Sequence, residues 1–225
     1  RELKGESRSE GKVGTFLLTP VWDSVAIDRA HEFPGGTSVV GIAGGSEGQR
    51  LGIARQYAKS ERLEIGANDT IDEIAERIRR MPVLDHLVWI VPWRRVMGVT
   101  DEALISAQRE GVLLGFRLIK ALLREGYGSK RLGLTVITTN SQRLTRHDVV
   151  DPAHASIHGF VGTLAKEYPG WAIRLLDMEA EGEWPIAEMF SVPADAQGNA
   201  TVCRHGEWFK QQLIRFVPDF ATEQR

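Results

Sequence analysis

The sequence predicts an α/β fold in which helices cover both faces of a mostly parallel sheet. Short apolar runs that suit strands alternate with stretches of helical periodicity over most of the 225 residues. Residues 86–91 (HLVWIV) and 132–138 (LGLTVIT) are almost continuously apolar, which is typical of strands covered on both faces. Five βα units in succession indicate a Rossmann-like arrangement.

The first unit starts after turn residues 34–36 (PGG). Residues 37–42 form a β-branched run that predicts a strand, and residues 48–60 predict the following helix. Residues 62–65 indicate a weaker second strand. Together they make one strand, its helix and the next strand.

Two helices have clear start signals. Thr70 with Glu73 three residues later forms a capping box, and Pro82 lies just beyond the expected end of that helix. Asp151 as N-cap and Pro152 at the first helical position begin another.

The longest predicted helix covers residues 101–125, where apolar residues recur every three or four positions. Gly126 stands where a helix would end. The last strand of the alternating series is predicted at residues 172–176.

The two chain ends depart from the alternation. Residues 15–22 (TFLLTPVW) precede the first unit, while residues 200–203 and 207–216 follow the last, joined by a short turn containing Gly206. We expect these segments to form a small antiparallel flap. Trp22 and Trp208 lie on them, and we expect both indole rings to be buried.

The domain organisation follows from this pattern. Residues 15–216 read as one domain, and the polar, charged residues 1–14 and the final residues 217–225 read as linkers toward other domains.

Composition excludes several classes of protein. There are 28 basic and 30 acidic residues, giving a net charge of −2, and the basic residues are scattered, so no nucleic-acid partner is indicated. Cys203 is the single cysteine, which excludes an internal disulfide and a cysteine-based metal site. No apolar run approaches the ~20 residues that span a bilayer. We therefore expect no membrane partner and a cytoplasmic location.

The stretch VVGIAGGSEG at residues 39–48 tests whether the chain binds a dinucleotide. Its glycines, at positions 41, 44, 45 and 48, do not match the G-x-G-x-x-G spacing of a dinucleotide loop. Glu47 adds a carboxylate beside the helix N-terminus, where it competes with a phosphate for the amides and the positive dipole end. A loop that only turns the chain is favoured over a nucleotide loop, and residual ligand binding by residues 41–48 is left open.

Catalytic residues are missing in the same way. Short-chain reductases use a Tyr as proton donor with a Lys four positions later, but Tyr57, Tyr127 and Tyr168 are followed at that position by Glu, Arg and Ala. His154 and His158 lie one helical turn apart and could share a metal ion, yet HASIH lacks a zinc-protease Glu and a third ligand, so packing or capping is favoured. We therefore predict no catalytic, cofactor-binding or metal-binding residue in this chain.

Three longer blocks carry a resemblance to a known family. Residues 108–140, 151–179 (DPAHASIHGFVGTLAKEYPGWAIRLLDME) and 193–213 resemble the structural half of a ketoreductase from a bacterial modular polyketide synthase, of the type served by a trans-acting acyltransferase. Trp22 in TPVW matches that family's opening strand. The resemblance covers roughly residues 15–216.

This resemblance implies a truncated Rossmann-like fold, similar to that of short-chain dehydrogenases, without nicotinamide binding. It also implies a partner, the catalytic subdomain, which would bind NADPH and reduce β-keto groups on an acyl carrier protein. By position, His154 would replace the catalytic Tyr of that half and His158 its Lys or Asn. The expected cofactor is therefore none in this chain and NADPH in the partner.

Two other functions stay open. One is an active NADPH-dependent β-ketoacyl reductase with irregular motifs, which nicotinamide binding would reveal. The other is a pseudo-ketoreductase that docks neighbouring methyltransferase, dehydratase or carrier domains.

Overall fold

The computed structural model describes residues 17–28 and 34–216. Its single sheet has the strand order β1-β8-β7-β6-β5-β4-β2-β3. Strands β2 to β7 pair in parallel with their neighbours in this order, and β8 pairs antiparallel with β7. The strands are β1 (Leu17–Ser24), β2 (Val40–Gly44), β3 (Ser60–Leu63), β4 (His86–Ile90), β5 (Leu132–Thr139), β6 (Trp171–Met178), β7 (Ala200–Arg204) and β8 (Glu207–Phe216).

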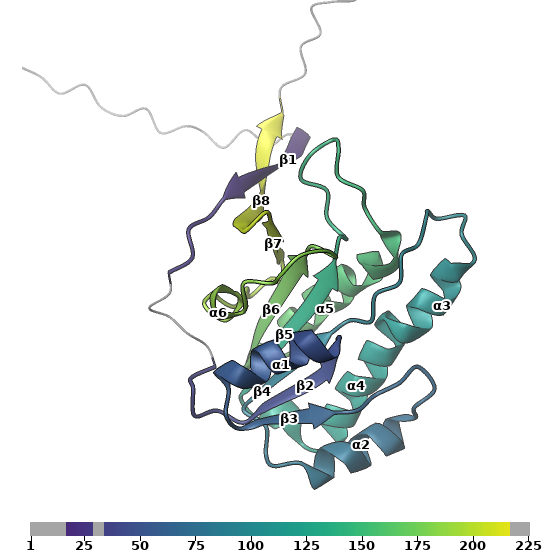
Figure 1. The fold of residues 1–225 in the computed structure, drawn as a ribbon, viewed down its shortest axis with the longest axis vertical. Helices are drawn as coiled ribbons and strands as arrows, with labels where there is room; N and C mark the ends of the chain where they lie inside the picture. The colour runs from purple at the N-terminus through teal and green to yellow at the C-terminus, as the bar shows by residue number, and fades with distance from the viewer. Residues whose placement is uncertain (1–16, 29–33, 217–225) are drawn as a thin grey trace, which may run out of the picture. The chain divides into compact units, whose positions relative to one another are not determined.

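Helices cover both faces of the parallel part of the sheet, as predicted. In Figure 1, α1 and α6 lie on one face, and α2, α4 and α5 lie on the other. The helices are α1 (Glu47–Gln56), α2 (Ile71–Arg80), α3 (Ala103–Glu110), α4 (Val112–Arg124), α5 (Ala155–Glu167) and α6 (Ile186–Met189). Each face has its own apolar core, the larger one built around Trp89 and the smaller one around Phe190.

Several sequence signals are confirmed. Thr70 caps α2 through the predicted box with Glu73, and the side chain of Asp151 accepts a hydrogen bond from the amide of Ala153. Gly126 takes the left-handed conformation (φ 80°) after α4. All residues of β4 and β5 are buried.

The predicted helix over residues 101–125 is corrected by the structure, because it is two helices. The chain breaks at Gly111, whose backbone (φ −93°, ψ −109°) lies outside the helical region. Beyond the break, a Cβ atom on Gly115 would come within 2.2 Å of the Trp89 ring. The glycines thus let α4 change direction and pack closely on the sheet.

The first unit is also corrected in its boundaries. The helix ends at Gln56 rather than at residue 60, because the extended Tyr57 turns into the smaller core and is fully buried. The following strand then begins at Ser60, two residues earlier than expected.

The end segments extend the sheet, since β7 pairs with β6 and turns into β8 at His205 and Gly206, both with positive φ. Trp208 is buried as expected, but Trp22 is only partly buried and donates its indole N–H to the carbonyl of Arg143 at 2.8 Å. The chain divides into two compact units. Described residues 17–21 and 212–216 belong to one, and residues 22–28 and 34–211 belong to the other. The predicted linkers, and residues 15–16, lie outside the described residues.

Candidate functional site

The strand order reverses at β2, which lies between β3 and β4. In open α/β sheets, ligands bind in the crevice outside the carboxyl ends of the strands at such a point. A cleft of about 550 Å³ lies there in this protein. It is lined by the Gly44–Gly45 turn after β2, by Pro92 and Trp93 after β4, and by Trp184.

The glycines at this cleft have a structural explanation. Gly44 and Gly45 both have left-handed backbones (φ 73° and 72°), which favour glycine. A Cβ atom on Gly44 would lie 2.1 Å from the carbonyl oxygen of Ile90, and one on Gly45 would lie 2.5 Å from the Cδ1 atom of that residue. The turn and the close approach of β4 therefore require both glycines, without any ligand.

Several groups that could hold a phosphate here are engaged within the chain. The amide of Ser46 donates to Oε1 of Gln49 at 2.8 Å, and the amide of Gln49 donates to Oγ of Ser46 at 3.3 Å. Glu47 adds a carboxylate to the first turn of α1. The Arg50 guanidinium donates to the carbonyls of Gly44 and Gly45. Two amides and one guanidinium at this loop are thus already bonded within the chain, and a carboxylate lies beside them.

His154 lies beside the cleft, in the turn that leads into α5, and is buried. Its Nδ1 accepts a hydrogen bond from the amide of Thr139 at 3.0 Å, so the ring hydrogen of the neutral imidazole is on Nε2. That Nε2 lies 3.0 Å from the carbonyl oxygen of Pro92 and donates to it. Burial holds the pKa of His154 below its ordinary value. The neutral ring thus ties the ends of β4 and β5 together.

His158, one turn further along α5, has different partners. Its Nε2 lies 2.6 Å from the hydroxyl of Ser141, and its Nδ1 lies 3.1 Å from the side-chain nitrogen Nε2 of Gln142. Burial lowers the pKa of His158 as well. The two histidines therefore have separate hydrogen-bond partners. Within the described residues, no group of three or more His, Cys, Asp or Glu side chains is placed to hold a metal ion.

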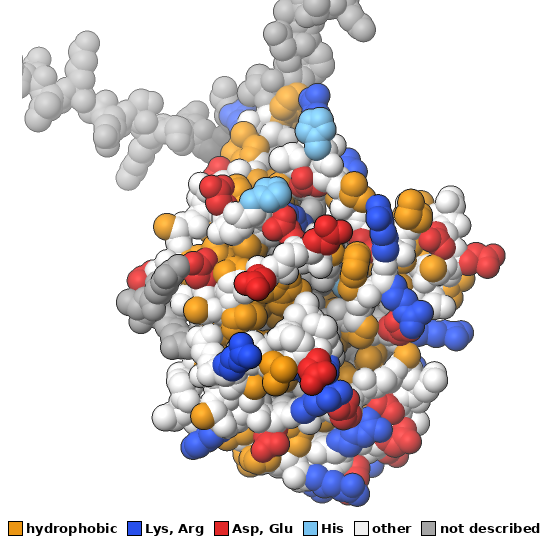
Figure 2. Space-filling view, in the orientation of Figure 1, with side chains coloured by type: hydrophobic (Ala, Val, Ile, Leu, Met, Phe, Trp, Pro, Cys, Tyr) orange, Lys and Arg blue, Asp and Glu red, His pale blue; other side chains and the backbone are white. Residues whose placement is uncertain are grey.

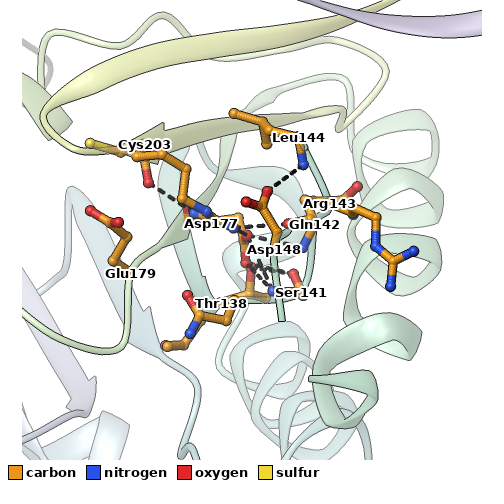
Figure 3. Close-up of polar contacts among 12 residues, drawn as sticks. Thr138, Ser141, Gln142, Arg143, Leu144, Asp148, Asp177, Glu179 and Cys203 are labelled. Carbon is orange, nitrogen blue, oxygen red and sulfur yellow. Dashed lines mark hydrogen bonds and ion pairs between the residues drawn. The ribbon is translucent and has the colours of Figure 1, made fainter. Parts of the chain in front are cut away.

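A buried ion pair, which the sequence analysis missed, anchors this region, and Figure 3 shows the polar contacts around its carboxylate residue, Asp177. Asp177 at the end of β6 is fully buried and lies 2.6 Å from the guanidinium of Arg204 on β7. The carboxylate also accepts hydrogen bonds from the hydroxyls of Thr138 (2.8 Å) and Ser141 (2.6 Å) and from the amide of Gln142 (3.1 Å). Burial, the largest influence, raises the pKa of Asp177, but Arg204 and the hydroxyl of Ser141 outweigh it and the pKa is lowered.

This arrangement differs in geometry from an activated serine nucleophile. A serine nucleophile needs a base that takes its proton, with a third group orienting the base. Here the carboxylate of Asp177 contacts Ser141 itself, and Ser141 has only one hydroxyl hydrogen to donate. With that hydrogen directed to Asp177, His158 donates to the serine oxygen. The network ties the loop after β5 to β6 and β7.

The segment after β4 is also fastened to the start of α5. Asp151 accepts hydrogen bonds from the indole N–H of Trp93 (2.9 Å) and from the amide of Val96 (3.2 Å). A second cavity of about 320 Å³ borders this fastening and is lined by Trp93, Asn140 and Glu179, among others.

On the face shown in Figure 2, Lys and Arg side chains lie among Asp and Glu side chains. This fits the scattered charge of the sequence. Across the described part of the chain, no helix is long and apolar enough to cross a membrane.

No protein-family model matches the chain. In sequence it is 38% identical to polyketide synthase PksM of Bacillus subtilis over an alignment of 225 positions, which covers 96% of this chain and 5% of PksM. It is 36% identical to PksN of the same bacterium and 31% identical to ThaG of Burkholderia thailandensis. The chain spans only 4–5% of the length of these relatives.

Solved structures share the fold at low sequence identity. A C2-type ketoreductase from a modular polyketide synthase matches with a TM-score of 0.68 and 16% identity, over 88% of this chain and 43% of that chain. An A-type ketoreductase matches with a TM-score of 0.65 and 15% identity, over 92% and 44% of the two chains. This chain therefore has a Rossmann-like, ketoreductase-like fold and is similar in sequence to one segment of bacterial polyketide synthases.

Proposed function

We propose that this chain is the non-catalytic structural subdomain of a polyketide synthase ketoreductase of the trans-acyltransferase type. In this role it stabilises and positions a catalytic subdomain, which binds NADPH and reduces β-ketoacyl groups on an acyl carrier protein. The observation that carries the proposal is the state of His154. At the position where the resemblance places a catalytic Tyr, a neutral, buried imidazole has both ring nitrogens bonded to main-chain groups.

The tyrosines support the same conclusion. A reductase of this type needs a Tyr hydroxyl at the cleft as proton donor. Tyr57 is fully buried and packs edge-on against Phe190, and Tyr127 accepts a hydrogen bond from the amide of Leu84 in the core. Tyr168 stacks on Trp171. All three tyrosines are thus committed to packing.

The fraction of each solved structure that this chain matches also supports the proposal that the chain is one part of a larger ketoreductase. Nine-tenths of this chain matches each of the two modular ketoreductases above, yet the match occupies less than half of either. A domain built from two subdomains in tandem, as the resemblance implies, would give this proportion.

The cofactor provides the decisive test. We expect NADPH at millimolar concentration to show no saturable binding to this chain by isothermal titration calorimetry, because the amides of Ser46 and Gln49 and the guanidinium of Arg50 are already bonded within the chain. An active modular ketoreductase serves as the positive control in the same buffer. Saturable binding in the micromolar range would show that the chain is a reductase with irregular motifs instead.

A further inference from the structure

The small unit of the molecule has an unusual surface. Its described residues, 17–21 and 212–216, come from β1 and β8, which are neighbours in the strand order. We call these two segments the apolar ribbon. Five of their apolar side chains are between 46% and 62% exposed: Leu17, Leu18, Leu213, Ile214 and Phe216.

These side chains lie on both faces of the ribbon. Successive residues of a strand point to opposite faces, so Leu17 and Leu18 differ in direction, as do Leu213 and Ile214. A strand with one solvated face alternates apolar and polar residues, and an isolated two-stranded hairpin is at best marginally stable in water. A ribbon that is apolar on both faces therefore calls for a partner that packs against its side chains.

Addition of another strand fits less well. β1 is the last strand in the order, so its outer edge is the place where a further strand would pair. Pro20 lies within β1 and has no amide hydrogen to offer, and proline is one of the residues by which proteins block pairing at sheet edges. Side-chain packing is therefore favoured over a continued sheet, including one formed with a second copy of this chain.

We propose that the apolar ribbon is the docking surface for the catalytic subdomain, which would cover it with apolar side chains. This inference rests on the proposed function. The extent of the structural matches indicates this partner, because more than half of each modular ketoreductase chain lies outside the match to this chain. A permanent partner in the same polypeptide also explains apolar exposure on both faces, because obligate interfaces are more apolar than transient ones.

The experiment measures the accessibility of single cysteines. Cys203 is buried and its pKa is raised to about 11, chiefly by burial, so it contributes little background labelling by a maleimide. Leu18→Cys and Ile214→Cys report on the ribbon. Val83→Cys is the matched control, since Val83 is an exposed apolar residue (65%) of the larger unit. Labelling rates are measured for the 225-residue chain alone and after addition of the ketoreductase segment that follows it in the same synthase.

We expect the labelling rate of both ribbon cysteines to fall by at least about tenfold once the segment is added, while the Val83→Cys rate stays unchanged. In addition, the double variant Leu213→Glu, Ile214→Glu should raise the Kd between the two polypeptides by at least about tenfold and so reduce their co-elution. Val83→Glu should leave the Kd unchanged. Co-elution with unchanged labelling of the ribbon would overturn this inference and leave the proposed function standing. Absence of any association would overturn both.

Discussion

Gly44 and Gly48 lie four residues apart in the same loop and helix start, but their surroundings differ. Gly44 has a positive φ, and its missing Cβ would clash with the backbone of Ile90, whereas nothing lies within 4 Å of a Cβ on Gly48. We expect Gly44→Ala to lower the free energy of unfolding by at least about 3 kcal/mol. Gly48→Ala should be neutral or stabilising by up to about 1 kcal/mol. Urea denaturation measures both, and equal effects would mean that the glycines are kept for another reason.

The buried histidines link stability to pH. Burial lowers the pKa values of His86, His154 and His158 in the folded state. Below their ordinary value of 6.5, the unfolded chain binds protons that the folded chain does not. Their stabilising contribution is therefore complete above pH 6.5 and is lost as the pH falls toward the lowered values.

We accordingly expect the free energy of unfolding to fall between pH 7 and pH 5.5. His154→Asn should reduce the slope by up to about 1.4 kcal/mol per pH unit, the effect of one proton. His147→Asn, at an exposed position, is the control and should leave the slope unchanged. Urea unfolding at several pH values gives the slopes, and a slope that His154→Asn does not alter would contradict the assignment.

At the level of secondary-structure elements, the pair Asp177–Arg204 joins β6, β7 and the loop after β5. Removing one partner of a buried pair leaves an uncompensated charge. We expect Asp177→Ala to cost about 3–5 kcal/mol of unfolding free energy. Glu64→Ala, which breaks the exposed pair with Arg62, should cost less than about 1 kcal/mol. Comparable losses in thermal or urea unfolding would show that the network does not hold these elements.

Sequence patterns predicted the elements whose signals are local. The capping box of Thr70 and the apolar run of β4 are examples, because their spacing alone specifies the structure. The break at Gly111 was not predictable in this way, since a glycine within a periodic helix is ambiguous. The direction that α4 takes after the break is set by the close packing of Gly115 on Trp89, which lies on β4, a strand distant in the sequence.

For the candidate site too, the sequence locates some residues, but only the fold shows their contacts. The sequence located His154 and His158, but their bonding partners lie on other elements, and only the fold brings Thr139 and Pro92 to opposite sides of one ring. Asp177 was missed because its partner follows 27 residues later. The two charged residues within the otherwise apolar strand WAIRLLDM, Arg174 and Asp177, were the available signal.

At the scale of the whole molecule, both ring nitrogens of His154 are bonded to main-chain groups, while apolar side chains of β1 and β8 are exposed. If the catalytic subdomain binds only the folded chain, it stabilises that chain by mass action, by about 2.7 kcal/mol at a hundredfold excess over Kd. For a chain of this length, we expect the melting temperature to rise by roughly 5–10 °C. Differential scanning calorimetry of the chain with increasing amounts of the adjoining segment provides the measurement. NADPH added to the chain alone is the control and should produce no shift, because the stabilisation comes from the partner's surface and not from a cofactor site in this chain. A melting temperature that is constant at every partner concentration, or one that NADPH alone raises, would remove the physical basis of the scaffold role.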